Sequence, residues 1–177
     1  MATSKKRAAG EKAAARPGVK ARTAGQSKTK TPGAIKGGNG KYQFPMARLK
    51  KVPAGNGYST SHGGVVEGAR MLVGYIHKPR GTGSRMHSHK NEQFNYVVQG
   101  TLKGSINGKR VLAPAGTLIY IPANAPHNLV STADEDVIFI AIKDLSQGIH
   151  GMAVDGTMSG PHFEKGFEPK SRRAKGA

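Results

Sequence analysis

Short apolar segments separated by glycine, proline and asparagine occupy the chain from Val65 onward, and this pattern limits the folds that it can adopt. The segments have strand length and are rich in β-branched and aromatic residues. They lie at residues 68–77, 85–89, 93–100, 101–112, 116–122, 127–131 and 136–143. Within 101–112, Asn107-Gly108 is typical of a type I′ hairpin turn. No segment shows a sustained helical period, so the sequence predicts an all-β fold, either an antiparallel sandwich or a barrel.

The positive charge of the chain is concentrated at its two ends. Of a net charge of +18, residues 1–51 contribute 14 Lys and Arg against the single Glu11, and residues 165–177 contribute five basic residues against one acidic residue. The first forty residues have almost no large apolar side chains, so they cannot bury enough surface to offset the entropy of the chain. We therefore expect a disordered basic tail over 1–41, a barrel over 42–145, and an extension over 146–177 that is basic at its end. This extension is either mobile or a flap over the mouth of the barrel.

Composition excludes several classes of protein. The chain has no Cys, which excludes disulfides, thiolate metal sites and a cysteine nucleophile. The longest apolar run, Val137 to Ile142, is far too short to span a bilayer, and no apolar stretch near the start could act as a secretory signal. We therefore expect a cytoplasmic protein without a membrane segment. The basic tail has two interpretations: sequence-independent contact with nucleic acid or another polyanion, or a solubilising tail with no fixed partner.

Two histidines stand at alternate positions as His87-Ser88-His89. In a strand, residues two apart project from the same face, so the two imidazoles can reach one ion. Imidazole is a suitable ligand for Zn, Ni, Cu, Fe and, less strongly, Mn. The pair by itself is a weak signal, because it arises easily by chance in a chain with seven His. The residues around it make the signal strong.

Spaced residues around this pair form two longer motifs. The first is Gly81, five residues, His87-x-His89, three residues, Gln93, six residues and Gly100; the second is Gly116, five residues, Pro122-x-Asn124, two residues and His127. Their order, spacing and short separation resemble the two signature motifs of the cupin family. The resemblance implies a double-stranded β-helix, which is a jelly-roll barrel, with one divalent metal ion (Zn, Ni, Fe, Mn or Cu) inside. It also implies that the ion is bound by His87, His89, His127 and a third residue of the first motif.

Two departures from the cupin pattern concern structure. Asn124 stands where the family prefers Gly, and Asn is the next most tolerant residue of a positive φ, so the turn is expected to survive. Ser131 replaces the usual closing Asn, and this change leaves the ligand set intact.

A third departure bears on function, because Gln93 stands where the family usually has Glu. In a regular strand Gln93 shares a face with His87 and His89, whereas Glu92 points to the opposite face. The stretch from His87 to Gln93 is also similar to the HxHxxEQ variant of cupins that use three His and one Gln. These cupins include an enzyme of uronate breakdown and certain polyketide cyclases. We take Gln93 as the fourth ligand; the alternatives are a ligating Glu92 or an open position.

The neutral ligand set favours one kind of chemistry. Four neutral ligands leave the full charge on the ion, which makes it a stronger Lewis acid. This favours isomerisation, tautomerisation or elimination of a small oxygenated acid or dicarbonyl compound, as in an isomerase or a lyase. One alternative is a non-haem Fe(II) dioxygenase in which Gln93 does not bind the ion. Another is a non-catalytic cupin that binds metal and ligand while its basic tail holds nucleic acid.

Four further residues are candidates for the substrate site. By the same alternation, Arg85 and Asn95 face the ion, and Arg85 either holds a substrate carboxylate or is a solvated charge at the rim. His77 and Tyr120 lie on neighbouring predicted strands and are candidates for proton transfer, although a tyrosine in a barrel more often packs. We therefore expect a small anionic substrate.

The resemblance also implies a homodimer, because small cupins pair their barrels through edge strands. Residues 41–60 have enough apolar content to form such an exchanged arm. The alternative is that they form a strand of their own barrel.

Overall fold

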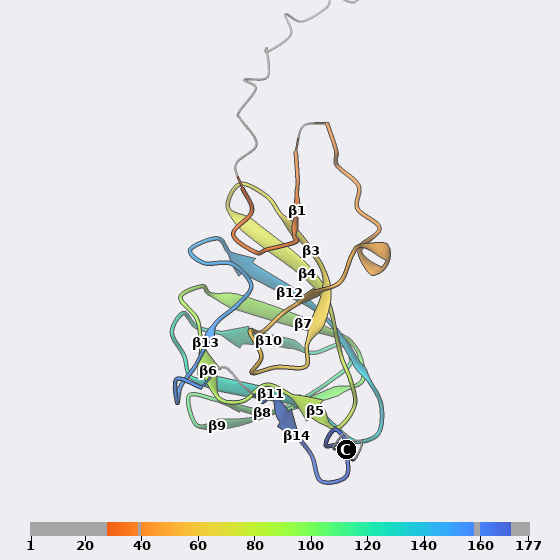
Figure 1. Ribbon diagram of the computed structural model, residues 1–177, viewed down its shortest axis with the longest axis vertical. Helices are drawn as coiled ribbons and strands as arrows, with labels where there is room; N and C mark the ends of the chain where they lie inside the picture. Colours follow the sequence, from red (N-terminus) through yellow and green to blue (C-terminus); the bar gives the residue numbers. More distant parts are fainter. Residues whose placement is uncertain (1–27, 39, 158–159, 171–177) are drawn as a thin grey trace, which may run out of the picture.

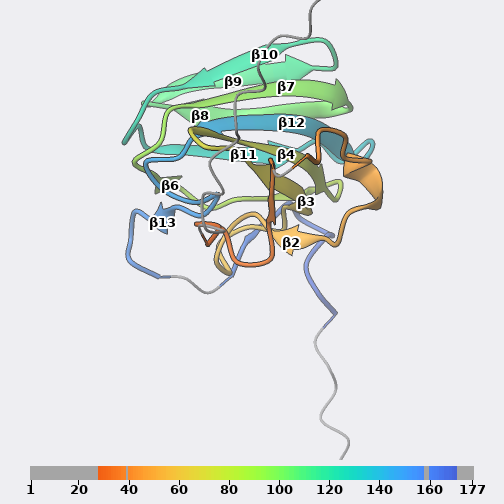
Figure 2. The ribbon, with the colours of Figure 1, turned by 90° about the horizontal axis from the view of Figure 1, so that it is seen from above.

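The computed structural model describes residues 28–38, 40–157 and 160–170 of the chain. These residues form two β-sheets and one short 3₁₀ helix, η1 (Met46–Arg48), as Figures 1 and 2 show. The predicted all-β jelly-roll fold is confirmed. Within the described residues, no helix has the length and apolar character that crossing a membrane requires.

Each sheet is built from strands that are distant in sequence. The first runs in the order β1 (Ile35–Lys36), β3 (His62–Glu67), β4 (Met71–Lys78), β12 (Val137–Asp144), β7 (Gln93–Gln99) and β10 (Leu118–Ile121), and β2 (Val52–Pro53) pairs with β3. The second runs in the order β13 (Met152–Ala153), β6 (His87–Ser88), β11 (His127–Ser131), β5 (Thr82–Gly83) and β14 (His162–Phe163). It is extended by β8 (Thr101–Ile106), which pairs with β11 and with β9 (Lys109–Pro114).

Alternation of side chains places the core between the two sheets. Along β12, Val137, Phe139 and Ala141 are buried, whereas the isoleucines between them are only half-buried. The neighbouring strands β7 and β10 alternate in the same way, with Val97 and Ile121 fully buried. Burying an aliphatic side chain of this size contributes about 1.5–3 kcal/mol. The inward row therefore fixes the register of each strand, because a shift by one residue would expose it.

Two turns adopt the backbone conformations that the sequence predicted. Asn107 and Gly108 have φ angles of 49° and 75°, the positive pair that a type I′ turn between β8 and β9 requires. Asn124 has a φ of 62°, so asparagine does adopt the left-handed conformation at this position. The turn before β11 is thereby kept without a glycine.

The sheet begins earlier than the sequence indicated, inside the segment 1–41 that we expected to be a disordered tail. β1 pairs in parallel with β3. The backbone N–H groups of Lys30 and Thr31 donate to the two carboxylate oxygens of Glu67, each at 2.7 Å, and Glu67 is buried. Hydrogen bonds to a buried carboxylate therefore hold a segment that has few apolar side chains. Residues 1–27, the rest of the expected tail, lie outside the described residues.

The described part of the extension after residue 145 is held by strand pairing and by the core. Ile149 belongs to the buried core, β13 pairs with β6, and β14 pairs with β5. Residues 41–60, the candidate for an exchanged arm, include β2, which pairs with β3 of the same chain; an exchange between two chains stays a prediction. The described domain thus extends beyond the expected limits of 42 and 145 at both ends.

Candidate metal centre and cavity

Three histidines from two separate segments meet between the sheets. His127 on β11 lies directly opposite His87 on β6 in the antiparallel register, and their ring centroids are 4.1 Å apart. His89 follows β6, and its ring centroid lies 4.9 Å from that of His127. One ring nitrogen from each of the three residues lies within 4.8 Å of the others. The structure therefore brings together the three histidines that the sequence motifs indicated.

Backbone carbonyls orient all three imidazoles. Nδ1 of His87 lies 2.8 Å from the carbonyl oxygen of Arg85, Nδ1 of His89 lies 2.8 Å from that of Asn91, and Nδ1 of His127 lies 2.9 Å from that of Ala125. A carbonyl can only accept, so each Nδ1 carries the hydrogen and each Nε2 keeps its lone pair. Fixing one ring nitrogen in this way is how proteins orient histidines that bind metal.

Burial keeps these imidazoles uncharged. Desolvation, reinforced by repulsion from His127, lowers the pKa of His87 to about 2. Desolvation and repulsion from Lys143 lower the pKa of His89 to about 3, and desolvation lowers that of His127 to about 4. Because a metal ion binds neutral imidazole, protons do not compete for these nitrogens at neutral pH.

The residues present fit a bound metal ion. Nε2 of His89 is buried and has no hydrogen-bond partner among the described residues. A buried polar atom left without a partner costs about 1–3 kcal/mol. An ion at this point would satisfy that atom, and imidazole nitrogen is a suitable donor for Zn, Ni, Cu and Fe. The three histidines could therefore hold such an ion.

Gln93 and Asn95 lie beside the histidines, and Glu92 does not. Gln93 and Asn95 are buried and line the same cavity as His87 and His127. Nε2 of Gln93 donates to Oδ1 of Asn95 at 2.6 Å, which leaves the carbonyl end of the Gln93 amide as the end able to bind an ion. Glu92 is exposed. Ligation by Gln93 stays a prediction, as does substrate binding by Asn95.

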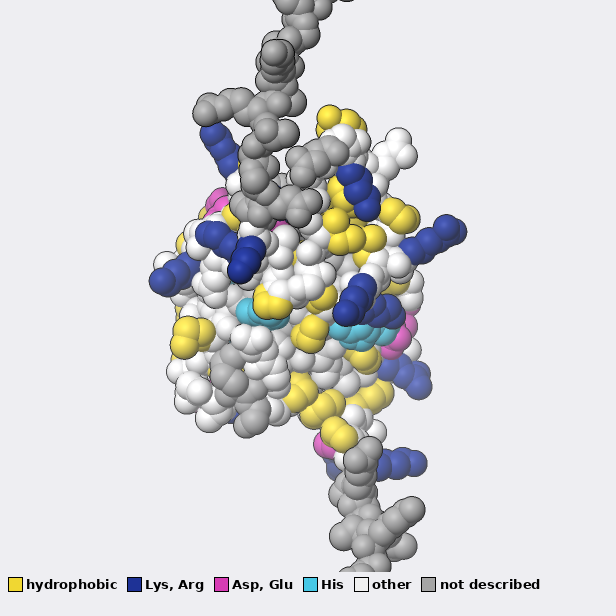
Figure 3. Space-filling view, turned by 45° about the horizontal axis from the view of Figure 1, so that its top comes forward, with side chains coloured by type: hydrophobic (Ala, Val, Ile, Leu, Met, Phe, Trp, Pro, Cys, Tyr) yellow, Lys and Arg dark blue, Asp and Glu magenta, His cyan; other side chains and the backbone are white. Residues whose placement is uncertain are grey.

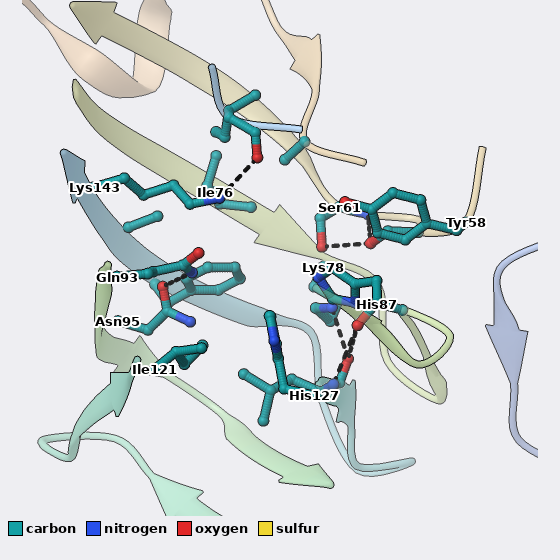
Figure 4. Close-up of a pocket in the computed structure, with 17 residues that line it drawn as sticks. Tyr58, Ser61, Ile76, Lys78, His87, Gln93, Asn95, Ile121, His127 and Lys143 are labelled. Atoms are coloured by element: carbon teal, nitrogen blue, oxygen red, sulfur yellow. Dashed lines mark hydrogen bonds between the residues drawn. The ribbon is translucent and has the colours of Figure 1, made fainter. Parts of the chain in front are cut away.

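A cavity of about 50 Å³ opens beside the histidines (Figure 4). Its wall combines apolar side chains with His87, His127, Gln93, Asn95, serines and two lysines, Lys78 and Lys143. No Asp or Glu is among its lining residues in the described part of the chain. The cavity is therefore a small site with donors and positive charge but without protein carboxylates.

The two lysines are the part of the site that our sequence analysis missed. Lys78 is 3% exposed and donates from Nζ to the carbonyl oxygen of Leu129 at 2.8 Å; Lys143 is 2% exposed and donates to that of Ile149 at 2.9 Å. Burial lowers the pKa of each to about 7. Strand alternation could have found Lys143, because it continues the inward row of Val137. Lys78 was not predicted because the expected strand ended at residue 77, one residue before the end of β4.

Tyr58 closes the cavity near His87. Its side chain is fully buried, its ring centroid lies 4.5 Å from that of His87, and its hydroxyl accepts a hydrogen bond from the backbone N–H of Gly151 at 2.8 Å. Burial raises the pKa of Tyr58 to about 12, so the hydroxyl stays protonated at neutral pH. Tyr58 connects the residues after β2 to the extension before β13, and no sequence motif pointed to it.

Three residues that the sequence offered as candidates are not among those lining the cavity. His77 alternates with the inward Ile76 and Lys78 on β4, and its Nε2 lies 2.9 Å from Oδ2 of Asp136. Tyr120 alternates with buried neighbours on β10; it is 49% exposed, and its ring packs on that of Phe94. The structure therefore does not bring either candidate for proton transfer to the histidines.

Arg85 likewise does not line the cavity. Its guanidinium pairs with Asp155, and its backbone carbonyl is the acceptor for Nδ1 of His87. Arg85 would share a face with His87 only if both lay on one continuous strand. Because β6 spans only His87–Ser88, Arg85 lies outside it and alternation does not apply.

Comparisons with known proteins give one match by sequence and several by structure. Residues 74–143 match the family model described as a cupin domain. No curated protein matches the chain. Among solved structures, the chain is similar to an RmlC-like cupin from Shewanella frigidimarina, with 19% identity and a TM-score of 0.48 over 58% of this chain and 88% of that one.

Two further solved structures are similar at lower scores. KdgF from Halomonas sp. has 22% identity and a TM-score of 0.44 over 48% of this chain and 77% of that one. The polyketide cyclase RemF from Streptomyces resistomycificus has 21% identity and a TM-score of 0.40 over 44% of this chain and 56% of that one. The match thus spans little more than half the length of the cyclase.

Proposed function

We propose that the protein is a metal-dependent enzyme, on the premise that residues 74–143 of the chain are a cupin domain. The proposed cofactor is one divalent ion, bound by His87, His89 and His127 with Gln93 as the fourth ligand. The proposed reaction is an isomerisation, tautomerisation or elimination that acts on a small oxygenated acid or dicarbonyl compound.

One observation carries this proposal. Three buried imidazoles converge, each with Nδ1 engaged by a backbone carbonyl, and Nε2 of His89 is left buried without a partner among the described residues. If these histidines only packed in the core, there would be no reason for the lone pairs of three Nε2 atoms to lie near one point. Because a catalytic metal site keeps one position for water or substrate, a ligand set beside a cavity favours catalysis over a closed structural site.

The residues around the cavity would have separate roles in the proposed reaction. When bound, an ion held by four neutral ligands supplies a Lewis acid that polarises a substrate carbonyl. Asn95 holds the amide of Gln93 in one orientation through their 2.6 Å hydrogen bond. Lys78 and Lys143 give the cavity positive charge, which favours an acidic substrate. Because the side chains that line the cavity are largely buried, electrostatic interactions there are stronger than in bulk solvent.

Metal analysis of the purified protein tests the ligand set. The wild-type chain, purified without chelator, is expected to contain one equivalent of a divalent transition metal. His89→Ala is expected to lose it, and Gln93→Ala to bind it more weakly. His162→Ala removes an exposed histidine on β14 and serves as the matched control, with wild-type metal content expected. A wild-type protein that binds no metal, or full metal content in His89→Ala, would contradict the proposal.

Oxygen dependence separates the proposed chemistry from the dioxygenase alternative. An isomerase, tautomerase or lyase of the proposed kind works without oxygen, because its reaction has no net redox change. Turnover of small acids is therefore expected to be equal in anaerobic and aerated buffer. Turnover that requires both Fe(II) and oxygen would instead assign the site to a dioxygenase.

We also propose that the protein is a homodimer, joined through the outer face of the first sheet. Outward side chains on three strands of this sheet, β4, β7 and β10, are apolar and at least one-third exposed: Met71, Val73, Tyr96, Val98, Leu118 and Tyr120. The half-buried isoleucines of β12 lie between them. An uncharged face allows two copies of a chain with a net charge of +18 to approach without local repulsion, and exposed apolar patches of this kind mark interaction sites.

Mass measurement in solution tests this dimer. The wild-type protein is expected to have twice the mass of one chain, and Leu118→Glu to be monomeric because each copy would bury an unpaired carboxylate in the interface. Leu112→Glu is the control, since Leu112 is 72% exposed on β9 of the other sheet. A monomeric wild type, or a dimer that Leu118→Glu leaves unchanged, would contradict it.

A further inference from the structure

We propose that Lys78 and Lys143 bind a substrate with two carboxylates, so that the enzyme acts on a short dicarboxylate. This rests on the proposed function, because it places the substrate in the same cavity. Neither lysine belongs to the sequence motifs of the metal site. Both are identified because they line the cavity and can give it positive charge.

The two lysines approach the cavity from different sides. Lys78 pairs with Val137 in the register of β4 and β12, and Lys143 lies six residues further along β12, which is about 20 Å along the strand. Figure 4 shows Lys143 beside Gln93 and Lys78 beside His87, with the cavity between them. Two ammonium groups in these positions match a ligand with one carboxylate at each end.

Each ammonium has donors to spare. A lysine ammonium carries three N–H donors, and each of these uses one on a backbone carbonyl, Leu129 for Lys78 and Ile149 for Lys143. Neither lysine forms a salt bridge with a described residue. The remaining donors are available to a ligand, and hydrogen bonds between an ammonium and a carboxylate are among the stronger ones.

Charge balance favours a ligand with two negative charges. The proposed ion and its four ligands carry a net charge of two, the lysines add positive charge when protonated, and the cavity has no Asp or Glu among its described lining residues. Buried charges in proteins are normally paired. The described lining offers no carboxylate, so the negative charge that pairs with the protonated lysines would come from the ligand. Lys and Arg side chains spread around one face of the molecule would also attract an anion (Figure 3).

The size of the cavity limits the dicarboxylate. Its volume of about 50 Å³ corresponds to about four water molecules, at 10–15 Å³ for each. Such a space suits a chain of two to four carbons with carboxylates at its ends.

Binding of matched acids by calorimetry tests the inference. The probes are malonate and succinate, compared with propionate and butyrate, which have the same numbers of carbons and one carboxylate fewer. The wild-type protein is expected to bind the better dicarboxylate at least about tenfold more tightly than its monocarboxylate match. Lys78→Met and Lys143→Met are each expected to lower dicarboxylate affinity at least about tenfold and monocarboxylate affinity much less. Lys109→Met, an exposed lysine on β9, is the control and is expected to bind as the wild type does.

The same titrations on metal-loaded and metal-free protein separate this inference from the proposed function. Metal is removed with a chelator that is then dialysed away, because the chelator is itself a polycarboxylate. A dicarboxylate preference that persists without metal and disappears in the lysine variants supports the inference, even if the wild type binds no metal and the proposed function fails. A protein that binds metal but shows no dicarboxylate preference, or keeps its preference in both lysine variants, overturns the inference and leaves the metal site standing.

Discussion

Replacing Lys78 by methionine is expected to make the metal-free protein more stable at neutral pH, by an amount that shrinks as the pH rises. Lys78 is 3% exposed, and burial lowers its pKa from 10.5 to about 7. The folded protein therefore disfavours the ammonium, whereas the unfolded chain binds that proton up to its ordinary pKa. Methionine has a similar length and no charge to bury, so the substitution removes this cost.

The difference in pKa gives the size of the effect. One pKa unit corresponds to about 1.4 kcal/mol, so burying the Lys78 ammonium costs about 4 kcal/mol at pH 7. As the pH rises from 7 to 9, Lys78 loses its proton in the folded state but keeps it in the unfolded state. The free energy of unfolding therefore rises with pH, and the cost of burying Lys78 falls to about 2 kcal/mol at pH 9. The raised pKa of Tyr58 acts only above its ordinary value of 10.0, and the lowered pKa of His87 only below 6.5. Neither group interferes in this window.

Urea unfolding of metal-free protein, followed by circular dichroism at pH 7, pH 8 and pH 9, measures the effect. The wild-type free energy of unfolding should rise across this range, and Lys78→Met should start higher and rise less. Leu129 keeps partners for its carbonyl oxygen after the substitution, because the N–H and the hydroxyl of Ser84 donate to it at 3.1 and 3.2 Å. A wild type whose stability is flat between pH 7 and pH 9, or a Lys78→Met protein less stable than wild type at pH 7, would refute the reasoning.

Three further predictions concern the second lysine, the histidines and the tail. Lys143→Met should gain less stability than Lys78→Met in the same urea assay, because it leaves the carbonyl oxygen of Ile149 without its only side-chain donor among the described residues, and an equal gain would contradict this. As the pH falls below 6.5, the free energy of unfolding of the metal-free protein should fall by about 1.4 kcal/mol per pH unit for each of the three buried histidines, because the unfolded chain binds protons that the folded site does not. Added zinc should oppose this loss, because it binds the neutral imidazoles of the folded state. Acid titrations with and without zinc measure both effects. Deleting residues 1–27, which carry seven Lys and Arg before Lys28 against one Glu, should weaken binding to DNA without changing metal content, as filter binding at physiological salt and metal analysis would show.

Elements with local signals could be predicted from the amino-acid sequence. The apolar run over residues 137–142 specifies β12, because it has strand length and is rich in β-branched residues. Asn107-Gly108 specifies its turn, since few residue pairs tolerate two positive φ angles. The spaced histidines pointed to one site, and the structure brings His87, His89 and His127 together.

Which faces meet, and which side chains surround the histidines, depends on contacts between segments that are distant in sequence. Alternation shows which residues of one strand share a face. Because β6 spans only two residues, it could not show that Arg85 shares a face with His87. Alternation also does not show which face of β4 or β10 is inward, so the positions of His77 and Tyr120 stayed open. The limits of the domain depend on contacts between distant residues, such as the backbone at residues 30 and 31 with Glu67. Lys78 and Lys143 became part of a site only when β4 and β12 were paired, because their roles depend on a cavity that no single segment encodes.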